Sequence, residues 1–151
     1  QSGPIVNAGG TLYGVGALDL RAAGDLVSPG TLASRGTARI EAVGTLDNAG
    51  GVVIAEALDV RVGSLVNDAG VIEQLGVAAG RVASSGAIDS RRGRIAGIGS
   101  GALEVAAGTV LDNGAGGVIG ANGALALSAQ RMANTGGAVE SGDALALTVA
   151  Q

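Results

Sequence analysis

The stretch Leu46–Val60, LDNAGGVVIAEALDV, contains one copy of a pattern that runs through the whole chain. It opens with an aliphatic residue, any residue and Asn, continues through a Gly-rich turn, and ends in two short apolar segments. The opening motif recurs with Asn or Ser at successive spacings of 21, 20, 19, 17, 29 and 21 residues. A period near 20 is much longer than the hydrophobic period of a helix or a strand, and it indicates a solenoid whose repeats bury their apolar faces against one another. The polar members of the motif are Asn7, Ser28, Asn48, Asn67, Ser84, Asn113 and Asn134.

Each repeat predicts two strands. After the turn comes a β-branched or aliphatic residue, and a second segment then alternates apolar residues with polar or small ones. Alternation at period 2 indicates a strand with one buried and one exposed face. The sequence therefore predicts an all-β fold, a parallel β-helix of about seven rungs. The residues expected after the turn are Leu12, Leu32, Val53, Ile72, Ile88, Ile119 and Val139. The second segments begin at Leu18, Ala38, Leu58, Leu75, Leu103, Leu125 and Leu145.

Composition agrees with this architecture. The 151 residues include 29 Gly and one aromatic residue, Tyr13, which suits tight corners around a narrow aliphatic interior. We expect residues 1–151 to form a single β-helix segment, an excerpt of a longer repeat shaft. The spacing of 29 residues predicts about nine extra residues in the fifth rung, as an irregular inserted loop at residues 89–101.

Several segments are similar to filamentous haemagglutinin repeats: Asn7–Gly10, Gly16–Leu20, Leu46–Gly51, Gly123–Leu127 and Met132–Gly137. The resemblance covers nearly the whole chain. It implies a right-handed parallel β-helix from the shaft of a large bacterial exoprotein of the two-partner-secretion class, which includes adhesins and contact-dependent growth-inhibition effectors. It also implies secretion or display at the bacterial cell surface, and an outer-membrane transporter that acts through a region outside this chain. It implies no catalytic residues.

The column of Asn and Ser residues has two interpretations. Stacked amides on the outside would make a ligand-binding strip, whereas stacked amides inside would hydrogen-bond from rung to rung. Buried polar side chains need partners, and a ladder of identical amides supplies them. We therefore expect an internal ladder, with Asn48 and Asn67 in adjacent rungs.

Charged residues form a checkerboard when the second strands are aligned. Every charge then has an opposite charge on the next rung and along its own strand. Paired carboxylates on a β-helix also occur in polysaccharide-cleaving sites, but interleaved arginines lower the pKa of a carboxyl and disfavour a general acid. We expect the checkerboard to fix strand register. One outward column contains Asp19, Arg39 and Asp59, and the next contains Arg21, Glu41 and Arg61.

Arg91, Arg92 and Arg94 fall within the expected insertion. Arginine pairs well with anionic groups, so these residues are candidates for contact with sulfated glycans or acidic lipid headgroups on a host or neighbouring cell. The alternative is a solvated loop whose arginines pair with Asp89 and other surface acids.

Other functions lack the residues they require. Without His or Cys, the chain has no Ser-His-Asp or Cys-His nucleophile and none of the usual zinc ligands, so we expect no metal or cofactor. A net charge of −4 and a single aromatic residue disfavour nucleic-acid binding. No apolar run reaches the ~20 residues of a membrane-spanning helix. The sequence favours a structural shaft; the alternative is a carbohydrate-active β-helix, such as a polysaccharide lyase or a glycan-binding tailspike-like fragment.

Overall fold

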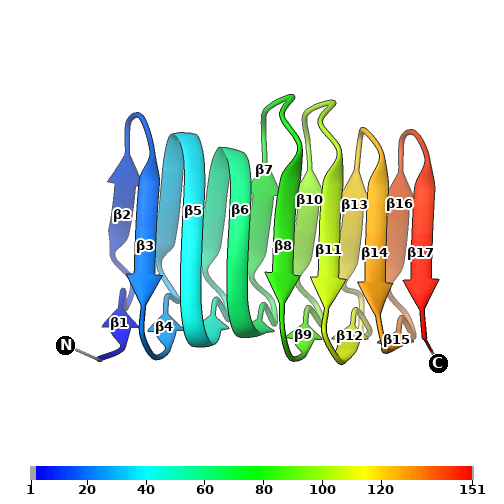
Figure 1. The fold of residues 1–151 in the computed structure, drawn as a ribbon, viewed down its shortest axis with the longest axis horizontal. Helices are drawn as coiled ribbons and strands as arrows, with labels where there is room; N and C mark the ends of the chain where they lie inside the picture. The colour runs from blue at the N-terminus through cyan, green and yellow to red at the C-terminus, as the bar shows by residue number, and fades with distance from the viewer. Residues whose placement is uncertain (1–2, 151) are drawn as a thin grey trace.

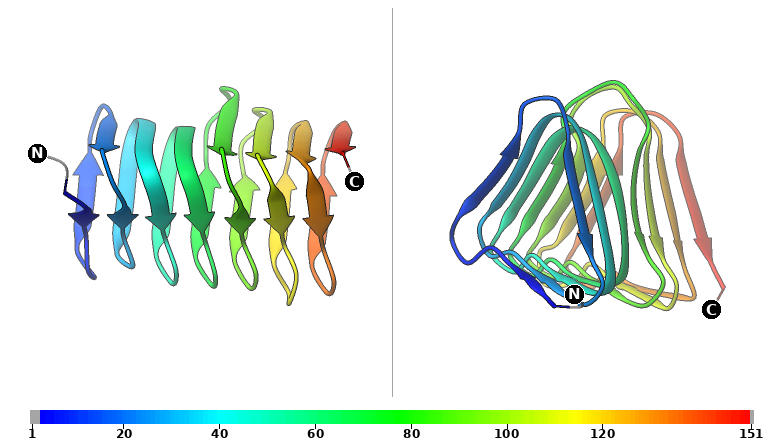
Figure 2. Two further views of the ribbon diagram at one scale, coloured as in Figure 1. Left: turned by 60° about the horizontal axis from the view of Figure 1, so that its bottom comes forward. Right: turned by 60° about the vertical axis from the view of Figure 1, so that its left-hand side comes forward.

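The structure is a computed structural model that describes residues 3–150. The chain winds into stacked coils, each built from three strands and three corners, and every strand pairs in parallel with the equivalent strand of the next coil (Figure 1). Viewed obliquely toward its N-terminal end, the stack has a triangular outline (Figure 2). Each of its three lateral faces holds seven strand segments from the described residues, so the predicted all-β solenoid of about seven rungs is confirmed.

The three faces are named here in the order in which one coil visits them after the Asn motif. Face A consists of β2 (Thr11–Gly14), the start of β5 (Thr31–Asp47), the start of β6 (Val52–Val66), β7 (Val71–Gln74), β10 (Arg94–Gly97), β13 (Val118–Ala121) and β16 (Ala138–Ser141). Face B consists of β3 (Leu18–Ala22), the middle of β5 and of β6, β8 (Gly80–Ser84), β11 (Leu103–Ala107), β14 (Leu125–Ala129) and β17 (Leu145–Val149). Face C consists of β1 (Ile5–Val6), β4 (Leu26–Val27), the ends of β5 and β6, β9 (Ile88–Asp89), β12 (Val110–Asp112) and β15 (Arg131–Ala133).

Alternate residues of each strand point inward and form continuous aliphatic columns. Burying such a column removes apolar surface from water at about 25 cal/mol per Å², which stabilises each coil against its neighbours. At the C-terminal end the columns are uncovered: Leu145 is 49% and Leu147 is 55% exposed. The inward column of face A contains Leu12, Leu32, Val53, Ile72, Ile95, Ile119 and Val139.

One member of that column differs from the prediction. Ile88 was expected on face A, but it lies on face C, paired with Leu65 and Leu111. Ile95 takes the predicted place and pairs with Ile72 and Ile119. Both isoleucines are fully buried, so the apolar pattern alone does not distinguish them.

The second strand of the fourth coil also differs from the prediction. Leu75-Gly76-Val77 was expected to be a strand on face B, but these residues form a corner, and β8 provides the strand. Gly80 stands in the column position of Leu103. The buried Gln74 side chain fills the space that a larger residue would need, because a Cβ on Gly80 would lie 1.8 Å from Gln74 Oε1.

The predicted insertion at residues 89–101 contains strand residues that keep the register of the neighbouring coils. Asp89 belongs to β9, and residues 94–97 form β10 in register with β7 and β13. The extra residues lie at 98–102, in a corner two residues longer than the one between Ala121 and Leu125. The previous coil has the same extended corner at 75–79, and both loops rise above the others (Figure 1). Within residues 3–150, no helix is long and apolar enough to cross a membrane.

Candidate functional site

The Asn column lies inside the coil, directly after the strands of face C. Its members are buried except Asn134, which lies in the last described coil. Asn48 Nδ2 donates to Asn67 Oδ1 at 2.8 Å, as an internal ladder requires. Asn67 Nδ2 continues to Ser90 Oγ at 3.3 Å. Asn7 Nδ2 likewise donates to Ser28 Oγ at 3.2 Å. These side chains are buried and bond to one another inside the coil, so they do not offer an external ligand strip.

Four of the asparagines also donate to a backbone carbonyl of the next coil; these are Asn7, Asn48, Asn67 and Asn113. Asn48 Nδ2, for example, donates to the Val71 carbonyl at 3.3 Å. Its Oδ1 lies above Gly51, where an added Cβ would come within 2.6 Å. The Ser28 carbonyl of the preceding coil would be closer still, at 2.2 Å, so the backbone of that coil and the amide together require a glycine at the end of the turn. Sequence reasoning did not identify this cause.

The prediction that Ser84 belongs to this column is wrong. Ser84 lies in β8 on face B, paired with Val62 and Ala107, and its hydroxyl donates to backbone carbonyls. Ser90 takes its place in the column, completely buried and bonded to Asn67. The tripeptides that end in these two serines both fit the aliphatic-x-Ser motif, so only the interstrand register separates them.

The ladder has two breaks. Among residues 3–150, the buried Oδ1 atoms of Asn48 and Asn113 have no hydrogen-bond partner. Each of these residues follows a serine in the column, Ser28 and Ser90 respectively. The serine side chain is shorter than asparagine, and its hydroxyl does not reach the next amide. A buried unpaired carbonyl of this kind costs about 1–3 kcal/mol.

The arginines predicted for glycan contact lie at a regular corner and are all paired with acids. Arg91 binds Asp89 at 2.6 Å, Arg92 binds Asp68, and Arg94 at the start of β10 binds Glu73 at 2.9 Å. The structure thus places the three cations near one another, but each has a carboxylate partner.

The acids at this corner are held in their ionised form. Hydrogen bonds from the Arg92 side chain lower the pKa of Asp68, and those from the Arg91 side chain lower the pKa of Asp89. A general acid needs a pKa raised toward neutrality, so both carboxyls are shifted in the wrong direction for glycoside cleavage. Within the described part of the chain, no group of three or more His, Cys, Asp or Glu could hold a metal ion.

The charge checkerboard occupies the outer surface of face B. Asp19, Arg39 and Asp59 pair across three coils, and Arg21, Glu41 and Arg61 do so beside them. The structure extends the first column by two residues that sequence reasoning missed, because Arg81 and Glu104 continue the alternation. They were missed because β8 was assigned to the wrong residues.

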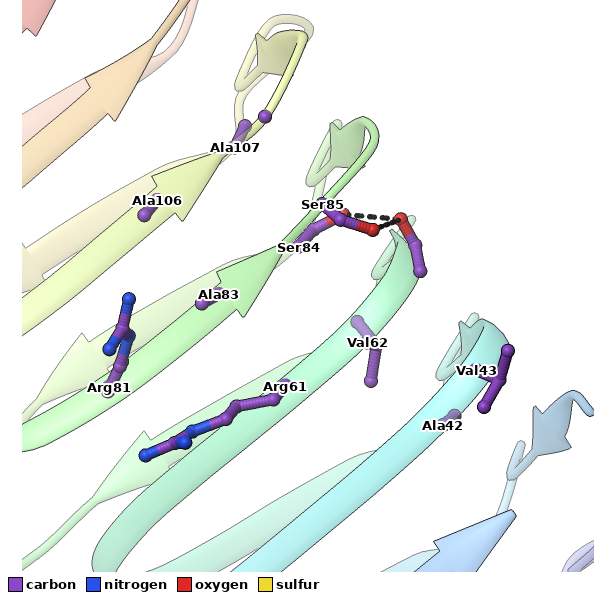
Figure 3. A pocket seen from close by; sticks show the side chains of 12 residues that line it. Ala42, Val43, Arg61, Val62, Arg81, Ala83, Ser84, Ser85, Ala106 and Ala107 are labelled. Carbon is purple, nitrogen blue, oxygen red and sulfur yellow. Dashed lines mark hydrogen bonds between the residues drawn. The ribbon is translucent and has the colours of Figure 1, made fainter. Parts of the chain in front are cut away.

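A shallow hollow adjoins this checkerboard where face B turns toward face C (Figure 3). Its volume is about 550 Å³. Arg61 and Arg81 border it, and the small side chains of Ala83 and Ala106 form part of its floor. Ser85 lies at its edge, where its hydroxyl donates to the Gly63 carbonyl at 3.3 Å.

Comparison with known proteins agrees with this geometry. A model of the haemagglutinin repeat matches residues 4–95 and 98–151, close to the full length of the chain. No curated protein and no solved structure matches it. The stacked coils, the internal amide ladder and this match together show that the chain belongs to the haemagglutinin repeat family.

Proposed function

We propose that this chain forms part of the rigid shaft of a large secreted or surface-exposed bacterial exoprotein, an adhesin or a contact-dependent growth-inhibition effector. The observation that supports this most is the uninterrupted stack of coils, in which both the aliphatic columns and most neighbouring pairs of the amide column continue from coil to coil. Each added coil lengthens such a stack by about 4.8 Å. A shaft of this kind holds the binding or effector regions of its parent away from the cell.

The partners of the parent protein are also part of this proposal. Its export uses an outer-membrane transporter that recognises a region outside this chain, and its exposed regions meet a glycan or receptor on a host or neighbouring cell. The coils suit such export because each contacts only its neighbours, so the chain can fold coil by coil after crossing the membrane as an extended polypeptide.

For the corner that contains Arg91, Arg92 and Arg94, we propose a structural role. Each guanidinium already pairs with a carboxylate of its own or a neighbouring coil. An anionic glycan would have to displace those carboxylates, and exposed pairs leave little net attraction once both partners are present.

The shaft proposal is tested by surface labelling of cells that produce the parent protein. Antibodies against residues 3–150 should label intact cells, and labelling should disappear when the transporter is deleted. Detection only after lysis would refute surface display.

Two deletions then test whether the segment acts as a stack. Removing residues 48–66 excises one coil and joins Asp47 to Asn67 in the original register. Removing residues 48–57 breaks that register. We expect the first deletion to preserve display and resistance to surface protease, and the second to lose both. Equal behaviour of the two deletions would contradict a stacked shaft.

A further inference from the structure

The checkerboard on face B is complete in the first three coils, and its second column stops after Arg61. In those coils each carboxylate of the pattern has an arginine across the coil boundary and another two residues away on its own strand. Glu41 illustrates this, since it accepts a hydrogen bond from Arg39 Nε at 3.0 Å and lies 3.7 Å from Arg21. The arginines of the pattern likewise bind a carboxylate on their own strand, as Arg61 binds Asp59 at 2.9 Å.

Position 83 should hold an acid according to this pattern. It pairs with Arg61 across the coil boundary and follows Arg81 by two residues on the same strand. Alanine stands there instead, and its partner on the next coil is Ala106. Two arginines therefore border a place in the pattern from which the carboxylate is missing.

Arg81 shows the consequence of this missing carboxylate. Among the described residues it has no hydrogen-bonded acid, and its nearest carboxylate oxygen, on Glu104, is 3.8 Å away. Arg61 uses Nε for its bond to Asp59, which leaves its terminal amino groups for another acceptor. The hollow of about 550 Å³ is lined by Arg61, Arg81 and Ala83, so a ligand lying in it can contact both arginines (Figure 3).

We propose that this hollow binds a carboxylate group of an extended uronate-containing polysaccharide, with Arg61 and Arg81 as its ligands. The sugar carboxylate occupies the place that an acid at position 83 would fill, and it accepts charge-assisted hydrogen bonds from both guanidinium groups. The hollow extends over four coils, from Ala42 to Ala107, so a chain lying along the shaft axis continues beyond the bound residue.

The surroundings favour a sugar chain with widely spaced charges. Face B has no free strand edge at this place, because β8 pairs with β6 on one side and β11 on the other. An added peptide strand therefore finds no backbone partners, whereas sugar hydroxyls can bind water and the exposed Ser85 hydroxyl. Asp59, Glu41 and Glu104 surround the two arginines and repel a densely charged polymer.

The test fills the vacant position with the missing acid. Ala83→Glu should satisfy Arg61 and Arg81 internally and weaken binding of hyaluronan oligosaccharides by at least about tenfold, the loss expected for charge-assisted hydrogen bonds. Ala146→Glu is the matched control, because it adds the same charge on face B at the exposed end of the stack and should leave binding unchanged. Arg81→Gln keeps most of the side chain and should weaken binding as Ala83→Glu does, which gives a second test if the first variant does not fold.

Calorimetric titration of these variants with three polymers decides the proposal. Hyaluronan should bind to the native chain, and heparin and polyglutamate should each bind more weakly than hyaluronan. Unchanged hyaluronan binding in Ala83→Glu and Arg81→Gln would overturn the proposal, and so would equal loss in Ala146→Glu. No measurable binding of hyaluronan to the native chain, or tighter binding of heparin or polyglutamate, would also refute it.

Discussion

Replacing Asn67 by alanine should strongly destabilise the protein. The side chain is completely buried and makes three hydrogen bonds, which no water can replace. It accepts from Asn48 at 2.8 Å, and it donates to Ser90 Oγ at 3.3 Å and to the Arg94 carbonyl at 3.2 Å. At about 1 kcal/mol net for each bond, the loss is about 3 kcal/mol. A chain of this size then melts roughly 6–12 °C lower.

The control is the same substitution at Asn134. This residue also accepts an amide bond, from Asn113 at 2.8 Å, but it is exposed in the last described coil. Asn113 Nδ2 keeps its bond to the Ala138 carbonyl at 2.9 Å, so the cost should stay below about 1 kcal/mol. Urea unfolding followed by circular dichroism measures both variants. Equal losses, or a loss below about 1 kcal/mol at Asn67, would refute the account of the ladder as a buried and mutually satisfied column.

Four further outcomes follow from the same contacts. Leu58→Ala should lower the free energy of unfolding by about 2–5 kcal/mol because the side chain is buried, whereas Asp59→Ser beside it should lower it by less than about 1 kcal/mol. Similar losses in urea unfolding would contradict the assignment of Leu58 to the inside and Asp59 to the outside. Ser90→Asn should raise stability by about 1 kcal/mol, since the longer amide reaches the unpaired Oδ1 of Asn113, and a fall in the urea midpoint would contradict this. The pKa of Asp89 is lowered mainly by its hydrogen bond from an arginine side chain, so its contribution to stability is present above pH 3.8 and disappears as the pH falls through its folded pKa. In Asp89→Asn the urea midpoint should therefore fall less between neutral and acid pH than it does in the native chain. Removing the charges of the three corner arginines should leave elution from a heparin column unchanged, and earlier elution would show that they bind glycan. The residues replaced by serine in that experiment are Arg91, Arg92 and Arg94.

Part of the fold follows from local sequence chemistry. Repetition near 20 residues, the alternation around Leu58 and the Gly-rich turn after Asn48 each specify their own structure within a few residues. The same alternation predicts Asp19, Arg39 and Asp59 in one outward column, where the structure has them. Strand periodicity determines which face a side chain takes, so these features could be predicted.

Tertiary structure decided the register of the fourth and fifth coils. Two tripeptides there, ending in Ser84 and Ser90, satisfy the same motif, and the choice between them depends on which strand each one meets in the neighbouring coils. Gly80 stands at a position of an aliphatic column where the side chain of Gln74, six residues earlier, fills the space of the missing aliphatic side chain. Gln74 Oε1 accepts a hydrogen bond from the Leu58 N–H at 3.0 Å. No local sequence pattern predicts that Gln74 replaces an aliphatic side chain at this position, because the replacement depends on contacts between residues of different coils.

The same limit applied to the arginine pair on face B. The checkerboard could be read from the sequence as far as Arg61, but the missing carboxylate at position 83 becomes visible only after β8 is placed correctly. Sequence by itself therefore determined the coil and, outside the fourth and fifth coils, the members of its inward columns and amide ladder, because each depends on periodicity along the chain. The tertiary structure decided which residues of different coils become neighbours, because corner lengths vary and a difference of two residues changes every later pairing.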